Sequence, residues 1–279
     1  MTAAAASASG GIATESFGWS FEPWIIVPLL LTAGLYAAGS RAMTKAGKAD
    51  RSPYHSMFWT GLLLLALALM SPLHEYGEHL FSAHMIEHEI LMVAAAPLLV
   101  AAQAGPVLLV GMPATVRNAM VAFIRSGSVQ QGWRGATDLL SATVIHTAVL
   151  WVWHIPVAYQ AAVANEGIHI VQHLSFIVSA ILFWSAVLDR DRRRYEQGLA
   201  ALALFFASLQ ASFLGALITF SNRLWYPAGV DPFPICGLDR GEDQALAGLI
   251  MWVPACTVYV VAALIILARW FGRLEARHG

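Results

Sequence analysis

The chain has 279 residues, of which 58% are hydrophobic and 12% are charged, and its mean hydropathy is +0.63. This composition excludes an ordinary soluble domain, and the sequence contains neither a phosphate-binding glycine loop nor a surface for nucleic acid. We therefore expect an all-α polytopic membrane protein whose surroundings are the lipid bilayer.

Seven apolar runs have about the 20 residues that a helix needs to cross a bilayer. One seven-helix transmembrane domain is predicted over residues 23–272, between a disordered outside tail (1–22) and an inside tail (273–279). The runs cover residues 24–40, 56–72, 79–102, 137–155, 167–188, 199–221 and 245–270.

Positive charge is distributed unevenly among the segments that join these runs. Fourteen of the 16 Lys and Arg residues lie in 41–52, 103–136, 189–198 and the end of the chain. Because cytoplasmic loops are enriched in Lys and Arg, this pattern predicts an outside N-terminus and an inside C-terminus. The 103–136 segment is expected to include a helix lying on the inner membrane surface.

Two histidine pairs with i, i+4 spacing occur near the outer ends of the third and fifth runs. They are His84 with His88 and His169 with His173. Such residues lie on one helix face with Cβ atoms about 5–6 Å apart, so two imidazoles can share one metal ion. His154 ends the fourth run at the same surface. We predict that the four paired histidines bind a metal, with His154 as a fifth ligand.

Two neighbours of the first pair have several possible roles. Glu87 lies on nearly the same face as His84, where it is a ligand, a hydrogen-bond partner of a ligand, or a carboxylate solvated at the headgroups. Met85 is a soft ligand suited to Cu(I) or a packing residue.

Glu89 is about 13–14 Å below Leu80 along the third run, a depth at which a carboxylate needs a partner. We predict a contact with His146, which lies at a similar depth in the fourth run. The remaining outer histidines of this region, His74 and His79, are expected to be ordinary loop residues.

Four separated motifs connect the sequence with a known family. They are SPLHEYGEHLFSAHMIEH (71–88), WHIP (153–156), HIVQHLSF (169–176) and DQALAGLIMWVP (243–254). On these motifs the chain resembles the multi-spanning CtaG family of bacterial cytochrome c oxidase assembly factors, which serve caa-type oxidases. The resemblance extends from about the second run to the seventh.

The resemblance implies a protein of the bacterial plasma membrane that helps to mature a haem-copper terminal oxidase through copper supply. Its partners would be oxidase subunits or copper chaperones. Asp243 and Gln244 would cap the seventh helix or orient a ligand. The carried-over residues are His84, Met85, His88, His154, His169, His173, Asp243, Gln244 and Trp252. Acidic Glu87 and Glu89 depart from the neutral residues expected within this motif, and carboxylates favour harder ions than Cu(I).

Other functions fit parts of the same pattern. His84, Glu87 and His88 form H-x-x-E-H, in which two histidines bind zinc and the glutamate acts as base in a hydrolase. Histidines on facing helices also ligate haem iron. In a passive scaffold, the histidines would only form hydrogen bonds between helices. We expect no catalytic turnover.

Overall fold

The structure is a computed structural model that describes residues 18–47, 52–189, 194–226 and 237–275. These ranges contain helices and no β-strand. Most of the predicted outside tail and the last four residues of the predicted inside tail lie outside the described residues. The final residues of the outside tail are described, and the backbone N–H of Ser20 donates to the carbonyl of Met70.

Six spans in the described ranges are long and apolar enough to cross a membrane, which confirms a multi-pass membrane protein. The fourth predicted span corresponds to α9 (Leu139–Trp153), which has 15 residues and makes a seventh span only if it is counted together with α8 (Gly127–Ala136), from which it is bent by 68°. The six are α1 (Pro23–Lys45), α2 (Ser52–Met70), a span made of α4 (Phe81–Glu89), η1 (Ile90–Ala95) and α5 (Ala96–Ala101), α11 (Glu166–Val187), α12 (Arg194–Thr219) and α13 (Arg240–Glu275).

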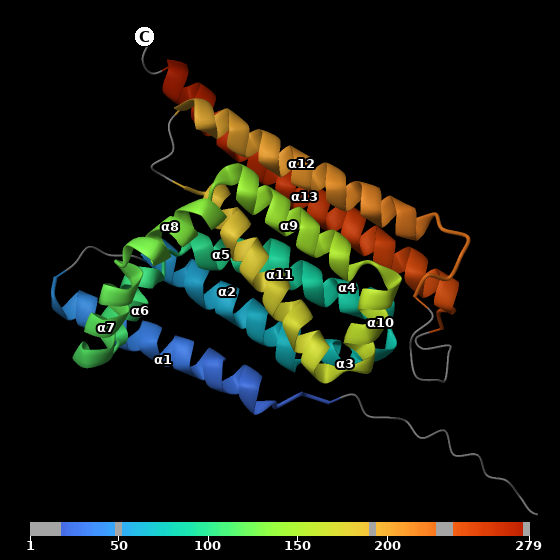
Figure 1. Cartoon of the computed structure of the whole chain (residues 1–279), viewed down its shortest axis with the longest axis horizontal. Coiled ribbons are helices and arrows are strands. Elements are labelled where there is room, and N and C mark those ends of the chain that lie inside the picture. The colour runs from blue at the N-terminus through green and yellow to red at the C-terminus, as the bar shows by residue number, and fades with distance from the viewer. Residues whose placement is uncertain (1–17, 48–51, 190–193, 227–236, 276–279) are drawn as a thin grey trace, which may run out of the picture.

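The helices run side by side, with α12 and α13 paired along one edge and α1 along the opposite edge (Figure 1). In its C-terminal half α1 packs closely on α6 (Gly105–Gly111), where a Cβ on Gly39 would collide with the carbonyl oxygen of Val107. The 103–136 segment also holds α7 (Ala114–Ile124), the helix expected from the sequence.

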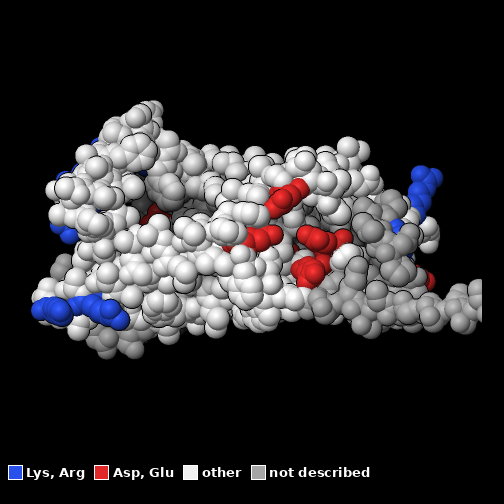
Figure 2. All heavy atoms as spheres, turned by 90° about the horizontal axis from the view of Figure 1, so that it is seen from below, with Lys and Arg blue, Asp and Glu red and all other residues white. Residues whose placement is uncertain are grey.

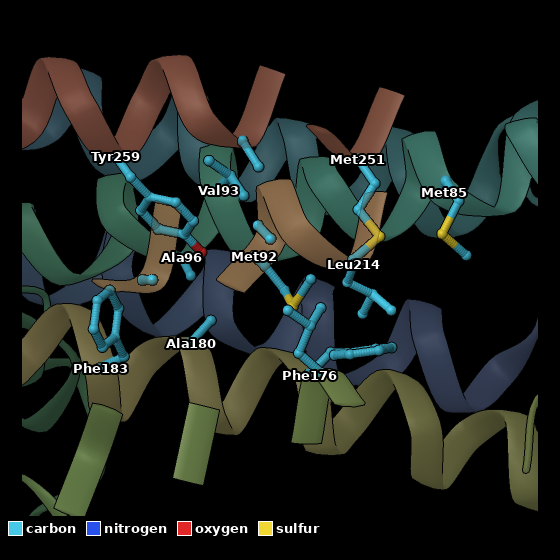
Figure 3. Close-up of a cluster of buried hydrophobic side chains, with 14 of the residues drawn as sticks. Met85, Met92, Val93, Ala96, Phe176, Ala180, Phe183, Leu214, Met251 and Tyr259 are labelled. Carbon is cyan, nitrogen blue, oxygen red and sulfur yellow. The ribbon is translucent and has the colours of Figure 1, made fainter. Parts of the chain in front are cut away.

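An apolar core fills the space between the third span, α11, α12 and α13 (Figure 3). Met92 from η1 lies near Phe176 of α11, and Leu214 and Met251 enter from α12 and α13. This packing fixes how the N-terminal half of the third span faces α11.

The third span is irregular at two points. An extended residue, Leu80, separates α4 from the short helix α3 (Pro72–His79), which begins at Pro72 after the N-cap Ser71. Further along, η1 is π-helical and therefore leaves some backbone groups outside the α-helical pattern. The indole N–H of Trp184 donates to the carbonyl of Met92 at 3.0 Å, so this carbonyl is satisfied within the bundle.

Asp243 fixes the beginning of α4 from a distant part of the chain. Its carboxylate accepts hydrogen bonds from the backbone N–H groups of Phe81 (2.8 Å) and Ser82 (3.0 Å) and from the Ser82 hydroxyl. The prediction that Asp243 caps its own helix is wrong, because Asp239 caps α13 by accepting from the N–H groups of Gly241 and Glu242. Asp243 instead caps α4, the helix that carries His84 and His88.

We predict that Asp243→Ala lowers the free energy of unfolding by about 2–4 kcal/mol, because it removes a cap and leaves buried N–H groups without acceptors. Thermal unfolding of the protein in detergent would measure the effect.

Asp138→Ala is the matched control, because Asp138 caps α9 at an exposed site through a 3.4 Å hydrogen bond to Ser141. The control is expected to cost about 1 kcal/mol or less. Equal losses in the two variants would contradict the special role of Asp243.

Candidate metal centre

Five histidines from three helices surround one glutamate near one end of the bundle. α3 supplies one histidine, while α4 and α11 supply two each, and the glutamate is on α4. The residues are His74, His84, His88, His169, His173 and Glu87, and we call them the histidine cluster.

The two predicted histidine pairs meet across the α4–α11 interface. The ring centroids of His84 and His169 are 5.3 Å apart, as are those of His88 and His173. Within each helix the paired rings are 4.2 Å (α4) and 4.3 Å (α11) apart. The i, i+4 spacing therefore produces one four-imidazole group, because the histidine faces of α4 and α11 point toward each other.

Glu87 lies at the centre of this group and is 0% exposed. Its Oε1 accepts a hydrogen bond from His74 Nδ1 at 2.8 Å and is 3.7 Å from His173 Nε2. Of the roles considered for Glu87, solvation at the headgroups does not apply.

His74 was expected to be an ordinary loop residue, and this prediction is wrong. Its ring is buried and stacks on His169 at 5.4 Å. Burial lowers the pKa of His74, but the hydrogen bond and negative charge of Glu87 outweigh burial and raise it above its usual value. The Ser71-Pro72 helix start, which places His74 one turn into α3, was the available sequence signal.

Most polar atoms of the histidine cluster have no hydrogen-bond partner although they are buried. Both ring nitrogens of His84 and of His88 are in this condition, as are Nε2 of His169 and His173 and Oε2 of Glu87. Buried polar groups normally have partners, and leaving one without a partner costs about 1–3 kcal/mol. Imidazole nitrogens and carboxylate oxygens are metal ligands, so this donor set fits a metal ion.

His154 and Met85 lie beside the histidine cluster and contact each other. Nε2 of His154 is 3.3 Å from the Met85 sulfur, and Nδ1 donates to the carbonyl of Leu150 at 2.7 Å. The His154 ring also packs near Phe176. The structure thus gives both nitrogens of His154 partners outside the four-imidazole group.

Gln244 holds the segment that follows α12. Its side chain accepts from the N–H of Trp225 at 2.8 Å and donates to the carbonyl of Arg223 at 3.0 Å. Tyr226, in the same segment, donates its hydroxyl to the carbonyl of His154 at 2.6 Å. Gln244 therefore positions His154 indirectly, whereas Trp252 of α13 packs near Phe220, the residue after the end of α12.

The hydrogen bonds of His146 go to residues other than Glu89, the partner predicted for it. Nδ1 of His146 is 3.4 Å from the Ser179 hydroxyl, and Nε2 is 3.0 Å from the hydroxyl of Tyr259. Tyr259 from α13 therefore makes the contact with His146 that the sequence predicted for Glu89. One carboxylate oxygen of Glu89 is buried without a hydrogen-bond partner.

A cavity of about 680 Å³ leads to the histidine cluster from the side of α1. His74, His84, His169 and His173 line it, together with apolar side chains of α1, α2 and α11. Three carboxylates, Glu22, Glu78 and Glu166, also line it. Acidic side chains gather on this face of the molecule, away from the Lys and Arg side chains toward its two ends (Figure 2).

Comparisons with known proteins agree with the four sequence motifs. Two uncharacterized proteins, from Mycobacterium bovis and Mycobacterium tuberculosis, are each 24% identical to the chain over 268 residues. Each match covers 90% of this chain but 39% of the relative, so the chain spans about two fifths of the length of these relatives. No solved structure matches the chain.

The sequence model of the cytochrome c oxidase caa3 assembly factor family, Caa3_CtaG, matches residues 34–273. The chain therefore belongs to the Caa3_CtaG family of cytochrome c oxidase assembly factors.

Proposed function

We propose that this protein assists assembly of a caa3-type cytochrome c oxidase by binding copper in the histidine cluster and passing it to an oxidase subunit or a copper chaperone. The observation that carries the proposal is the set of buried imidazole nitrogens without hydrogen-bond partners. Histidines that served only as hydrogen-bond links between helices would have partners, as His146 does.

The donor set supports copper. Imidazole and carboxylate ligands suit Cu(II) and Zn(II), and Cu(II) binds most tightly of the divalent first-row metals at a given site of this kind. The described residues place no thiolate or thioether in the histidine cluster itself. The adjacent pair of His154 and Met85 supplies a softer imidazole and thioether combination, which suits Cu(I).

The two other functions considered receive less support. A zinc hydrolase of the H-x-x-E-H type would bind zinc through His84 and His88 and keep Glu87 as the base, whereas the carboxylate of Glu87 groups as a ligand with His84 and His169 and with His74 and His173. A haem would need a slot between facing histidines, whereas the rings of His84 and His169 stack directly at 5.3 Å. Direct ring contacts suit small ions better than a macrocycle.

The proposal includes an outward-facing centre with the N-terminus outside, as the distribution of Lys and Arg predicts. In this orientation the cavity gives ions an approach from the outer surface. Glu22, Glu78 and Glu166 would attract cations there, because clefts lined by charge of one sign concentrate the opposite charge. Copper handed to an oxidase subunit would leave on the same side.

We predict that protein purified without added metal contains copper, and that the double variant His84→Ala, His173→Ala loses most of it. The double variant removes one ligand from each facing helix. Elemental analysis of both proteins measures the metal directly.

His55→Ala is the control, because His55 pairs with Tyr36 between α1 and α2, outside the histidine cluster. It is expected to keep the wild-type metal content. Equal metal content in the wild type and the double variant would refute a shared site, and one zinc per chain with measurable hydrolysis would favour the hydrolase.

We also predict that Glu78→Gln combined with Glu166→Gln slows Cu(II) uptake about threefold or more at low salt, because two attracting charges leave the cavity. The final metal content is expected to stay the same. Stopped-flow mixing of metal-free protein with Cu(II) at low and high ionic strength would measure the rates, which are expected to converge as salt screens the charges.

Glu242→Gln is the matched control, since Glu242 is an exposed acidic residue near the start of α13 that does not line the cavity. Uptake that is equally slow in the control, or unchanged in the double variant at low salt, would contradict the entry route.

A further inference from the structure

The histidine cluster contains more ligands than one ion uses. Zinc and copper sites in proteins usually have about four ligands. The histidine cluster offers five imidazoles and one carboxylate, and most of their nitrogen and oxygen atoms are buried without hydrogen-bond partners. One ion at the centre would leave part of this donor set both buried and unpaired, which is energetically costly.

The ligand atoms divide into two groups that share Glu87. One group consists of His74, Glu87 and His173, and the other of His84, Glu87 and His169. Within each group the ligand atoms lie within 4.8 Å of one another. Glu87 could therefore contribute a ligand to each of two ions.

The two oxygens of Glu87 have different surroundings. Oε1 is the atom that contacts His74 and lies near His173. Oε2 has no partner and lies on the side of Gly77, whose Cβ position would be 3.3 Å from Oε2 and 3.3 Å from the Cα of His84. An ion on the Oε1 side would replace the proton of the His74–Glu87 hydrogen bond, whereas Oε2 is open to a second ion.

We propose that the histidine cluster binds two metal ions bridged by Glu87. His74 and His173 hold one ion and His84 and His169 hold the other, while His88, which contacts both His84 and His173, supplies a further imidazole. Two ions held by a shared carboxylate are typically about 3.5–4 Å apart. The bridge also places a negative charge between two positive charges. This inference rests on the proposed metal-binding function of the cluster.

The test is the number of ions bound by the full chain in detergent after incubation with excess Cu(II) or Zn(II) and removal of unbound metal. Two ions per folded chain are expected. The copper form is expected to give the electron paramagnetic resonance spectrum of a magnetically coupled pair, because the ions are close together.

His74→Ala removes a ligand of one ion only and is expected to reduce the content from two ions to one, with the spectrum of an isolated Cu(II). His79→Ala, on the same helix α3, is the matched control and should retain two coupled ions. Circular dichroism and thermal unfolding show whether each variant is folded.

The possible outcomes separate the two proposals. One ion in the folded wild-type chain would overturn the two-ion site but leave the proposed function standing, whereas no bound ion would overturn both. Two ions with uncoupled spectra would overturn the Glu87 bridge. Two coupled ions in the wild type and one in His74→Ala would support it.

Discussion

The hydrogen bond between His74 and Glu87 organises the end of the bundle that carries the histidine cluster. A carboxylate that is 0% exposed inside an apolar bundle is costly unless it has a partner, and His74 provides that partner from outside the spans. The bond joins α3 to α4, and the proximity of His173 to the same oxygen adds α11. The helices α3, α4 and α11 are thus joined at the carboxylate of Glu87, and their imidazoles lie around it.

Asp243 and Gln244, which lie outside the histidine cluster, help to position Glu87 and the imidazoles around it. Asp243 fixes the first turn of α4 from α13, and Gln244, the next residue, holds the segment whose Tyr226 bonds to the carbonyl of His154. The apolar core holds the third span along its length, through Phe81 and Met85 of α4 and through Met92 and Ala96 further along. The start of α13 therefore stabilises both the cluster and the neighbouring pair of His154 and Met85.

Local patterns in the sequence predicted local features well. Apolar runs identified the spans, and the i, i+4 spacing placed His84 with His88 and His169 with His173 on single faces. What could not be predicted depends on contacts between distant segments. The capping of α4 by Asp243 joins residues about 160 positions apart, and Tyr259 reaches His146 from another helix. The sequence did not show that α9 is short, because the apolar run 137–155 continues past Trp153, where the helix ends.

The π-helical η1 has a geometric consequence for the third span. A π-helical turn holds about one residue more than an α-helical turn, and one residue corresponds to about 100° around a helix. The N-terminal half of the span, with its histidines toward α11, is therefore out of phase with α5, whose Ala96 and Val100 pack in the apolar core. Removing one residue from 90–95 would preserve the composition of both halves but turn the histidines away from α11. The number of residues in 90–95 therefore sets the rotation of α4 about its helix axis. This rotation determines whether the histidines of α4 face those of α11.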